Sequence, residues 1–397
     1  MLTAAATFEF YNKTGWITPV IELGTSSDGT GMARALVCYR DNAAVWPDQP
    51  HLTCNLMSLG ETATDNVVAS KRVVTTEARV DGGLSISLAK LDNDKAIVCY
   101  KLYQGSSGNM ACSCNALEVA GTGLDEHVSP TSNLLLSTNM TSDISVTGLD
   151  SSNAIVCYKD HATDRQGHSG ICKHVSLSTT PFGLTSTGSS SGLLISNWYS
   201  DGWARAGSVA AFDSSSAIVC YGDMSSTPAN AGTCKFLYWS GTALFAGIDI
   251  VFNEGASRDV NVVALDSGNA IVCYKDYANG ESGTCNLLQR SGGAVSVGTA
   301  AVFVAPTVEG YGANVNDISV AKISASEAIV CYRANKGTCK PLSVSGTALT
   351  VGAEALFVDG YMGNRPSVTG LSQGLTKALV CYPDTEGDCT RLAYPSA

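Results

Sequence analysis

Short apolar runs, each bounded by glycine, serine, asparagine or aspartate, follow one another along the whole chain. The segment 259–304 contains four such runs, at 259–266, 270–276, 283–290 and 294–304. The runs are too short for amphipathic helices. Their Val, Ile, Leu and Thr residues and their turn-forming boundaries are typical of β-strands. The pattern therefore predicts groups of four strands joined by turns.

The second run of each group is nearly continuous in apolar residues and carries the sequence Val-Cys-Tyr. It occurs seven times, with its cysteine at Cys38, Cys99, Cys157, Cys220, Cys273, Cys331 and Cys381. Successive copies are 61, 58, 63, 53, 58 and 50 residues apart, a period that suits a four-stranded propeller blade. Continuous apolar character is expected where both faces of a sheet are covered, so the repeat favours radial packing.

With these features the chain resembles the seven-bladed β-propellers as a class, over essentially its whole length. The resemblance implies an all-β fold with four antiparallel strands per blade and a single domain over 1–397. The approximate blades are 12–77, 78–139, 140–196, 197–254, 255–307, 308–360, and 361–397 completed by 1–11. The Trp-Asp ending of WD40 repeats and the paired glycines of kelch repeats are absent, so the resemblance implies no functional residues.

The seventh copy ends after three strands. The N-terminal segment 2–11 resembles the fourth runs at 294–304 and 348–358. We therefore expect the N-terminal strand to complete the last blade, which would remove the exposed sheet edges that an open repeat leaves.

Each Val-Cys-Tyr cysteine is followed by a second cysteine on the next predicted strand. Directly opposed positions of an antiparallel hairpin bring Cβ atoms close enough for a disulfide. Seven disulfides are predicted: Cys38 with Cys54, Cys99 with Cys114, Cys157 with Cys172, Cys220 with Cys234, Cys273 with Cys285, Cys331 with Cys339, and Cys381 with Cys389. A zinc interpretation competes, but the spacings are long and most copies lack histidine.

The fifteenth cysteine, Cys112, is left over, because Cys114-Asn115-Ala116-Leu117 aligns with Cys285-Asn286-Leu287-Leu288. We expect Cys112 to be unpaired or to form an intermolecular bridge. So many regularly spaced cysteines indicate an oxidising compartment and a secreted protein. Asn12 and Asn139 begin sequons that are compatible with N-glycosylation.

The net charge of −11 and the pI of about 4.9 argue against nucleic-acid and anionic-membrane partners. No apolar run approaches the length of a membrane span. The chain also begins without a basic and apolar leader, so we expect either a mature chain or another export route.

The loops between the second and third strands vary in length and would share one rim of the disc with the connections between blades. Variable loops on a rigid frame are where binding usually resides, so this rim is the expected functional face. The insertion 178–207 is its most unusual part. The residues expected to stack on a sugar and to form hydrogen bonds with it are Trp46, Trp198, Tyr199, Asp201, Trp203 and Arg205. The simpler alternative, which the sequence favours, is that these tryptophans only pack the insertion onto the disc.

Four arginines stand shortly before a first strand, close to the predicted axis, and three aspartates occupy similar places. They are Arg79, Arg205, Arg258 and Arg365, with Asp143, Asp259 and Asp317. Ion pairs among themselves are the favoured interpretation; an anion or a sugar in the channel mouth is the alternative. The tyrosine of each Val-Cys-Tyr copy is expected to pack between blades, and the aspartate that follows most copies is expected to cap loop amides.

No nucleophile elbow, P-loop or dinucleotide motif occurs, so no catalytic residue, metal or cofactor is predicted. Three functions remain open. The first is a non-catalytic extracellular binding module, with a carbohydrate or an extracellular protein as partner. The second is a self-assembling subunit of a surface layer or filament. The third is a glycoside-processing enzyme, which would need two facing carboxylates in the channel.

Overall fold

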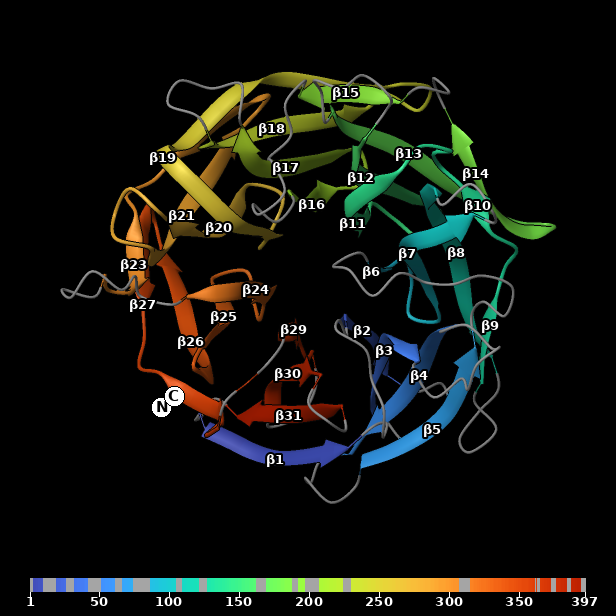
Figure 1. Cartoon of the computed structure of the whole chain (residues 1–397), viewed down its shortest axis with the longest axis horizontal. Helices are drawn as coiled ribbons and strands as arrows, with labels where there is room; N and C mark the ends of the chain where they lie inside the picture. The colour runs from blue at the N-terminus through green and yellow to red at the C-terminus, as the bar shows by residue number, and fades with distance from the viewer. Residues whose placement is uncertain are drawn as a thin grey trace.

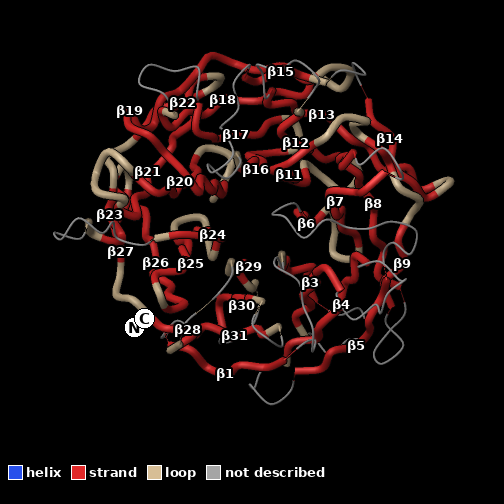
Figure 2. Tube along the Cα trace, in the orientation of Figure 1, coloured by secondary structure: helices blue, strands red, loops and turns tan. Residues whose placement is uncertain are grey.

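The computed structural model describes the chain in seventeen pieces. They are residues 3–9, 19–25, 32–41, 51–60, 66–73, 86–104, 109–120, 127–161, 169–187, 192–196, 207–223, 230–306, 315–360, 362, 365–372, 376–383 and 387–393. Within these residues the protein is all-β, with antiparallel sheets and no helix. Figure 2 shows strands in every part of the described chain.

The first three sheets follow the chain in order. One contains β2 (Val20–Thr25), β3 (Ala33–Asp41), β4 (His51–Leu59) and β5 (Asn66–Val73). The next contains β6 (Ile86–Lys90), β7 (Lys95–Gln104) and β8 (Asn109–Ala120), with β9 (His127–Pro130) and β10 (Leu134–Leu135) both paired to β8. The third contains β11 (Thr141–Gly148), β12 (Asn153–Asp160) and β13 (Ser169–Thr179), with β14 (Phe182–Thr187) and β15 (Leu193–Ser196) both paired to β13.

The fourth sheet has eight strands because one long strand belongs to two repeats. Its strands are β16 (Ser208–Asp213), β17 (Ser216–Asp223), β18 (Ala231–Trp239), β19 (Leu244–Ala264), β20 (Asn269–Asp276), β21 (Ser282–Ser291), β22 (Ala294–Val297) and β23 (Ala301–Val304). The first half of β19 pairs with β18, and its second half, from Ser257, pairs with β20. The fourth strand of one repeat therefore runs directly into the first strand of the next.

Two sheets remain, and the second of them contains strands from both ends of the chain. One contains β24 (Asn316–Lys322), β25 (Glu327–Ala334) and β26 (Lys336–Ser345), with β27 (Ala348–Val351) and β28 (Ala355–Val358) both paired to β26. The other has the order β1 (Thr3–Glu9), β31 (Asp388–Ala393), β30 (Thr376–Tyr382) and β29 (Ser367–Gly370). The N-terminal strand thus pairs with β31, as the sequence pattern predicts.

The fourth run of a repeat forms two short strands rather than the single strand predicted at 294–304 and 348–358. The chain breaks at Gly298 and at Gly352, whose amides donate to the carbonyl oxygens of Leu287 and Pro341. A Cβ atom at Gly352 would lie 2.6 Å from the side chain of Pro341. The bend therefore depends on a close approach that only glycine permits.

The first strands of the repeats lie nearest to a common centre, and we call them the inner strands: β2, β6, β11, β16, β19 from Ser257 onward, β24 and β29 (Figure 1). Each inner strand contacts the next, and β29 contacts β2. The approach is close: a Cβ atom at Gly148 would collide with the carbonyl oxygen of Lys90 on the preceding inner strand.

Among the described residues the core consists of seven apolar clusters, each formed between neighbouring repeats. One of them joins the last repeat to the first through Leu371 and Leu379 on one side and Val37 and Met57 on the other. The tyrosine of every Val-Cys-Tyr copy is buried in one of these clusters, which confirms its predicted packing role. Burial on both faces accounts for the continuous apolar character of the second strands.

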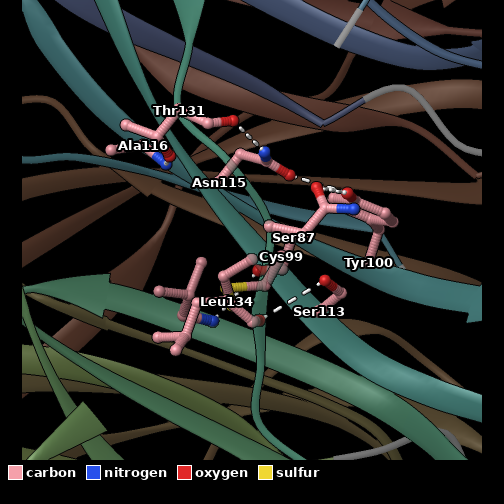
Figure 3. Close-up of a disulfide and its surroundings, with 11 residues drawn as sticks. Ser87, Cys99, Tyr100, Ser113, Asn115, Ala116, Thr131 and Leu134 are labelled. Atoms are coloured by element: carbon pink, nitrogen blue, oxygen red, sulfur yellow. Dashed lines mark hydrogen bonds between the residues drawn. A yellow bond between two sulfur atoms is a disulfide. The ribbon is translucent and has the colours of Figure 1, made fainter. Parts of the chain in front are cut away.

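Seven disulfides join the cysteines that the sequence pairs. In each pair the cysteines are directly opposed on adjacent strands, as in the register of Cys157 with Cys172, with Cα atoms 4.0–4.1 Å apart. Figure 3 shows the Cys99–Cys114 disulfide beside Tyr100, whose hydroxyl donates to Asn115 at 2.6 Å. The seven disulfides point to an oxidising, extracellular environment.

Candidate functional site

One residue of each inner strand lies opposite the first cysteine of its repeat. In six repeats this residue has a small polar side chain, and these side chains form a ring around the centre of the molecule. We call it the waist ring. Its members are Ser87, Ser145, Ser208, Asn261, Ser319 and Ser367, which pair with the first cysteine of their own repeats. In the first repeat Pro19 takes this place, because its carbonyl oxygen accepts from the Cys38 amide.

The waist ring joins most of the inner strands to the next one. Five of its oxygens accept a backbone N–H from the following inner strand, at 3.0–3.2 Å; the pairs are Ser87 with Val146, Ser145 with Val209, Asn261 with Val320, Ser319 with Val368, and Ser367 with Val20. The last pair links the two ends of the chain. The side-chain protons of these five residues have no acceptor among the described residues.

Four charged residues lie two positions before the waist ring. Asp143, Asp259 and Asp317 occupy this place in three repeats, and Arg365 occupies it in the last. Each aspartate has a positive φ angle, between 50° and 59°, and lies in an irregularity of the strand register. Aspartate tolerates this left-handed conformation better than most residues. The same unusual backbone therefore brings three carboxylates to one level.

Arg365 stands among these carboxylates. Its Nε donates to Asp317 Oδ1 at 3.0 Å, and Arg333 Nε donates to Asp317 Oδ2 at 2.7 Å. Both oxygens of Asp317 are therefore engaged, and its side chain is 1% exposed. Burial lowers the pKa of the Arg365 guanidinium to about 10, although the charges of Asp259 and Asp143 act in the opposite direction. Arg365 Nη2 is buried and has no hydrogen-bond partner among the residues that the structure describes.

These groups line a cavity of about 180 Å³, which we call the axial cavity. Its wall contains the three aspartates, Arg365 and the whole waist ring. A second cavity of about 610 Å³ continues along the axis and shares most of the waist ring, so this ring separates the two. The axial cavity lies where the second strands end, since Thr141 pairs with Asp160. It therefore lies on the rim expected to carry the functional loops.

The predicted ligand-binding residues lie outside the described residues: Trp46, Trp198, Tyr199, Asp201, Trp203 and Arg205. Arg79, Asn12 and Asp384 lie outside them too. Of the other residues predicted near the axis, Arg365 and the three aspartates meet in the axial cavity. Arg258 does not line it; its guanidinium stacks on the ring of Tyr277 at 4.4 Å and donates to the Tyr277 hydroxyl.

Among the described residues, aspartates that end the second strands accept hydrogen bonds from side chains of the incoming connection. Asp160 accepts from Ser137 Oγ and Asn139 Nδ2, and Asp223 accepts from Ser196 Oγ. Asp276 combines both roles, because it accepts from Asn253 Nδ2 and from the Ala278 amide. Amide capping is therefore only part of their role.

Cys112 is free and fully buried. Burial raises the pKa of its thiol, against the opposing effect of Lys173, so the reactive thiolate is disfavoured. A thiol without exposed surface cannot reach a second chain unless the strand opens. The structure therefore favours the unpaired alternative over an intermolecular bridge.

The waist ring is the part of the site that the sequence interpretation missed. A signal for it exists, because a serine or asparagine stands twelve residues before the first cysteine in six copies. In five of them, Ser87 and Asn261 among them, this residue belongs to the ring; Ser26 of the first copy lies outside the described residues. In three copies an aspartate stands two residues earlier still. The spacing to the repeated cysteine therefore marks both the waist ring and the aspartates that stand two residues before it.

A scan against models of protein families finds no match, and a search of curated proteins finds none either. Among solved structures, the chain is similar to a fungal alcohol oxidase of the AA5 family in complex with copper, with 12% identity and a TM-score of 0.58. The match covers 99% of this chain and 76% of that one.

Two further similar structures are 6-phosphogluconolactonase-like proteins. The one from Bacteroides fragilis has 9% identity and a TM-score of 0.58, with 92% of this chain and 95% of that one covered. The one from Bacteroides uniformis has 10% identity and a TM-score of 0.55, with 93% of each chain covered. At this identity the similarity concerns the fold alone, and it relates the protein to propeller structures.

No group of three His, Cys, Asp or Glu side chains that could hold a metal ion occurs within the described part of the chain. At the axis a guanidinium already stands among the carboxylates, so the residues there do not fit a metal.

Within the described part of the chain no helix is long and apolar enough to cross a membrane.

Proposed function

We propose that this protein is a secreted, non-catalytic binding module, built as a closed seven-bladed β-propeller, that holds a carbohydrate in its axial cavity. The pairing of β1 with β31 supports closure of the last blade by the N-terminal strand. The contact of β29 with β2, and the apolar cluster between the last and first repeats, support a closed ring within a single domain.

The observation that carries the binding function is the arrangement of donors and acceptors in the axial cavity. Carboxylates of Asp143 and Asp259 accept hydrogen bonds at the mouth, while the waist ring and Arg365 Nη2 offer protons without an acceptor in the described chain. A sugar hydroxyl both donates and accepts hydrogen bonds. One sugar residue can therefore donate to the carboxylates and accept from the waist ring and Arg365. A cavity of about 180 Å³ is smaller than a drug-sized site and suits one terminal residue.

The disulfides add a second line of support. Each repeat is fixed by a disulfide between its second and third strands, directly behind the inner strand that carries the site. A rigid wall lowers the conformational entropy lost on binding. We propose that Trp198, Trp203 and Trp46 extend the site on the loop-bearing rim by stacking on further sugar residues.

The experiment is a glycan microarray, followed by calorimetric titration of the tightest glycan against three proteins. They are the wild type, Arg365→Gln, and the control Arg258→Gln, whose guanidinium contacts Tyr277 rather than the cavity. We expect Arg365→Gln to lose affinity at least tenfold and the control to retain it. Binding to no glycan, or equal affinity of all three proteins, would reject the proposal.

A glycoside-processing enzyme is the second candidate, because the same cavity brings several carboxylates together. Asp317 is unsuited to acid or base work, since guanidinium groups engage both of its oxygens. The other two carboxylates that line the cavity, Asp143 and Asp259, would form the pair. New reducing ends after prolonged incubation with a bound glycan, lost in Asp143→Asn, would favour the enzyme over the binding module.

A further inference from the structure

Two hydrogen bonds lead from the end of a second strand to the wall of the axial cavity. The Ser142 hydroxyl lies 2.8 Å from His161 Nε2 and donates to Asp143 Oδ2 at 3.1 Å. Asp143 is the member of this chain that lines the cavity. We infer that Ser142 and His161 are positioning residues, which hold the Asp143 carboxylate in the orientation that a ligand meets. The inference rests on the carbohydrate function proposed above.

The backbone brings these three residues together. Asp143 has a φ angle of 57° and lies in an irregularity of the register between β11 and β12, directly after Ser142. His161 follows Asp160, the last residue of β12, and its amide donates to the Met140 carbonyl oxygen at 2.8 Å. The side chains of Ser142, Asp143 and His161 are all half-buried. Hydrogen bonds in such a place are electrostatically stronger than in water.

The direction of the two bonds follows from the number of protons. A serine hydroxyl has one proton and an ionised carboxylate can only accept, so the Ser142 proton points to Asp143. The His161 ring then donates from Nε2–H to the Ser142 oxygen. Each bond polarises the next and strengthens it. The chain ends on Asp143 Oδ2 and therefore restrains the rotation of this carboxylate.

The fifth repeat contains a related pair that does something else. Arg258 stands directly before Asp259, as Ser142 stands before its aspartate, and its guanidinium donates to the Tyr277 hydroxyl at 3.1 Å. Tyr277 follows β20 as His161 follows β12. The serine of the third repeat differs from Arg258 because it bonds to the aspartate that follows it. A restrained carboxylate loses less conformational entropy when a ligand binds, so the serine pair favours binding.

The first experiment is a double-mutant cycle, read by calorimetric titration of the tightest glycan from the array. Ser142→Ala should weaken binding about fivefold in the wild-type background. In Asp143→Gly, where glycine adopts the left-handed backbone without a side chain, Ser142→Ala should cause no further loss, because the hydroxyl acts through the carboxylate. Ser142→Thr keeps the hydroxyl and should bind as the wild type does.

The matched control is Ser215→Ala. It removes a hydrogen bond of the same kind, from Ser215 Oγ to Asp213 Oδ1 at 3.0 Å, outside the axial cavity. Its glycan affinity should equal that of the wild type.

The second measurement needs no ligand. Nitrogen NMR of the His161 ring at neutral pH reports which ring nitrogen carries a proton, and the inference requires a proton on Nε2. The same spectra show whether Ser142→Ala and Asp143→Gly remain folded.

Equal losses from Ser142→Ala in both backgrounds, weakened binding by Ser142→Thr or Ser215→Ala, or an Nε2 without a proton would overturn the inference. Each of these results leaves the carbohydrate-binding module in place. If the wild type binds no glycan on the array, the proposed function fails, and the inference fails with it because no ligand then meets Asp143.

Discussion

Arg365 and Asp317 occupy the same position of consecutive inner strands, and the Arg365 Nε donates to Asp317 Oδ1 at 3.0 Å. The last repeat thus places a cation where three others place an aspartate. This exchange allows the carboxylates to share one level near the axis, because a wholly acidic ring would repel itself. Within the described part of the chain, the Nη2 of the same guanidinium is buried and has no hydrogen-bond partner.

Replacing Arg365 by aspartate should destabilise the fold by about 3 kcal/mol, because it adds a fourth carboxylate and removes one partner of a buried acid. Denaturant unfolding at pH 7 measures the change. Arg258→Asp serves as the control, since its guanidinium makes only the Tyr277 contacts among those described. Equal stability of both variants would mean that the axial cluster is not coupled to folding.

Asp213 and Arg290 tie two repeats together in a second charged contact, with Arg290 Nη1 2.7 Å from Asp213 Oδ2. Although burial acts to raise it, hydrogen bonds from Arg290, Ser216 and Ser215 hold the pKa of Asp213 well below its usual range. An acid whose pKa is lowered by folding stabilises the protein above its ordinary pKa, about 4, and loses that contribution as the pH falls further. Arg290→Met should therefore cost about 2 kcal/mol at pH 7 and nearly as much at pH 2.5, as measured by urea unfolding, because the lowered pKa keeps Asp213 ionised in the folded protein at both pH values.

His174 predicts a pH dependence at milder acidity. Burial lowers the pKa of its imidazole from 6.5 to about 4, against a smaller opposite effect of Asp150, and its ring stacks on Trp239 with centroids 3.5 Å apart. The unfolded chain takes up the proton first, so stability should decline as the pH falls from about 6.5 to about 4. His174→Gln should remove this decline, whereas His161→Gln should keep it. Unfolding free energies at pH 7 and pH 4.5 give the comparison.

Deletion of residues 1–11 removes β1 and leaves β31 as an unpaired edge. The truncated chain should be less stable by several kcal/mol and should self-associate, because an exposed strand edge offers a template for pairing. Thermal unfolding and light scattering measure the two effects. An unchanged melting temperature in a monomeric truncated chain would show that the N-terminal strand does not close the last repeat.

The disulfides should contribute unequally. A chain-entropy estimate gives about 2.5 kcal/mol for Cys331–Cys339 and about 3 kcal/mol for Cys38–Cys54, because the second closes the longer loop. Paired Cys→Ala variants of each should follow this order in denaturant unfolding. Cys112→Ala should cost less than either, since Cys112 is unpaired. A reversed order would mean that local packing outweighs loop length.

The repeat made much of the fold predictable. The cysteine spacing, the apolar second strands and the short seventh copy led to the strand groups, to the disulfide partners and to the pairing of β1 with β31. These features depend on contacts within one repeat or on a strand count, which a single sequence records directly.

The site was less predictable because its contacts join different repeats. The bond from Val146 to Ser87 spans 59 residues, and the stacking of His174 on Trp239 joins two sheets. Nothing in the local sequence specifies which residues meet across such an interface. The left-handed backbone of Asp143, Asp259 and Asp317 was not predicted either, because it arises at an irregularity of the strand register, which the apolar pattern of a single strand does not record.

The most direct test of the account is a crystal structure of the protein with the tightest glycan from the microarray. The account predicts one terminal sugar residue in the axial cavity, with its donors on Asp143 and Asp259 and its oxygens facing the waist ring and Arg365 Nη2. A glycan bound elsewhere on the molecule, with the axial cavity free of sugar, would contradict it.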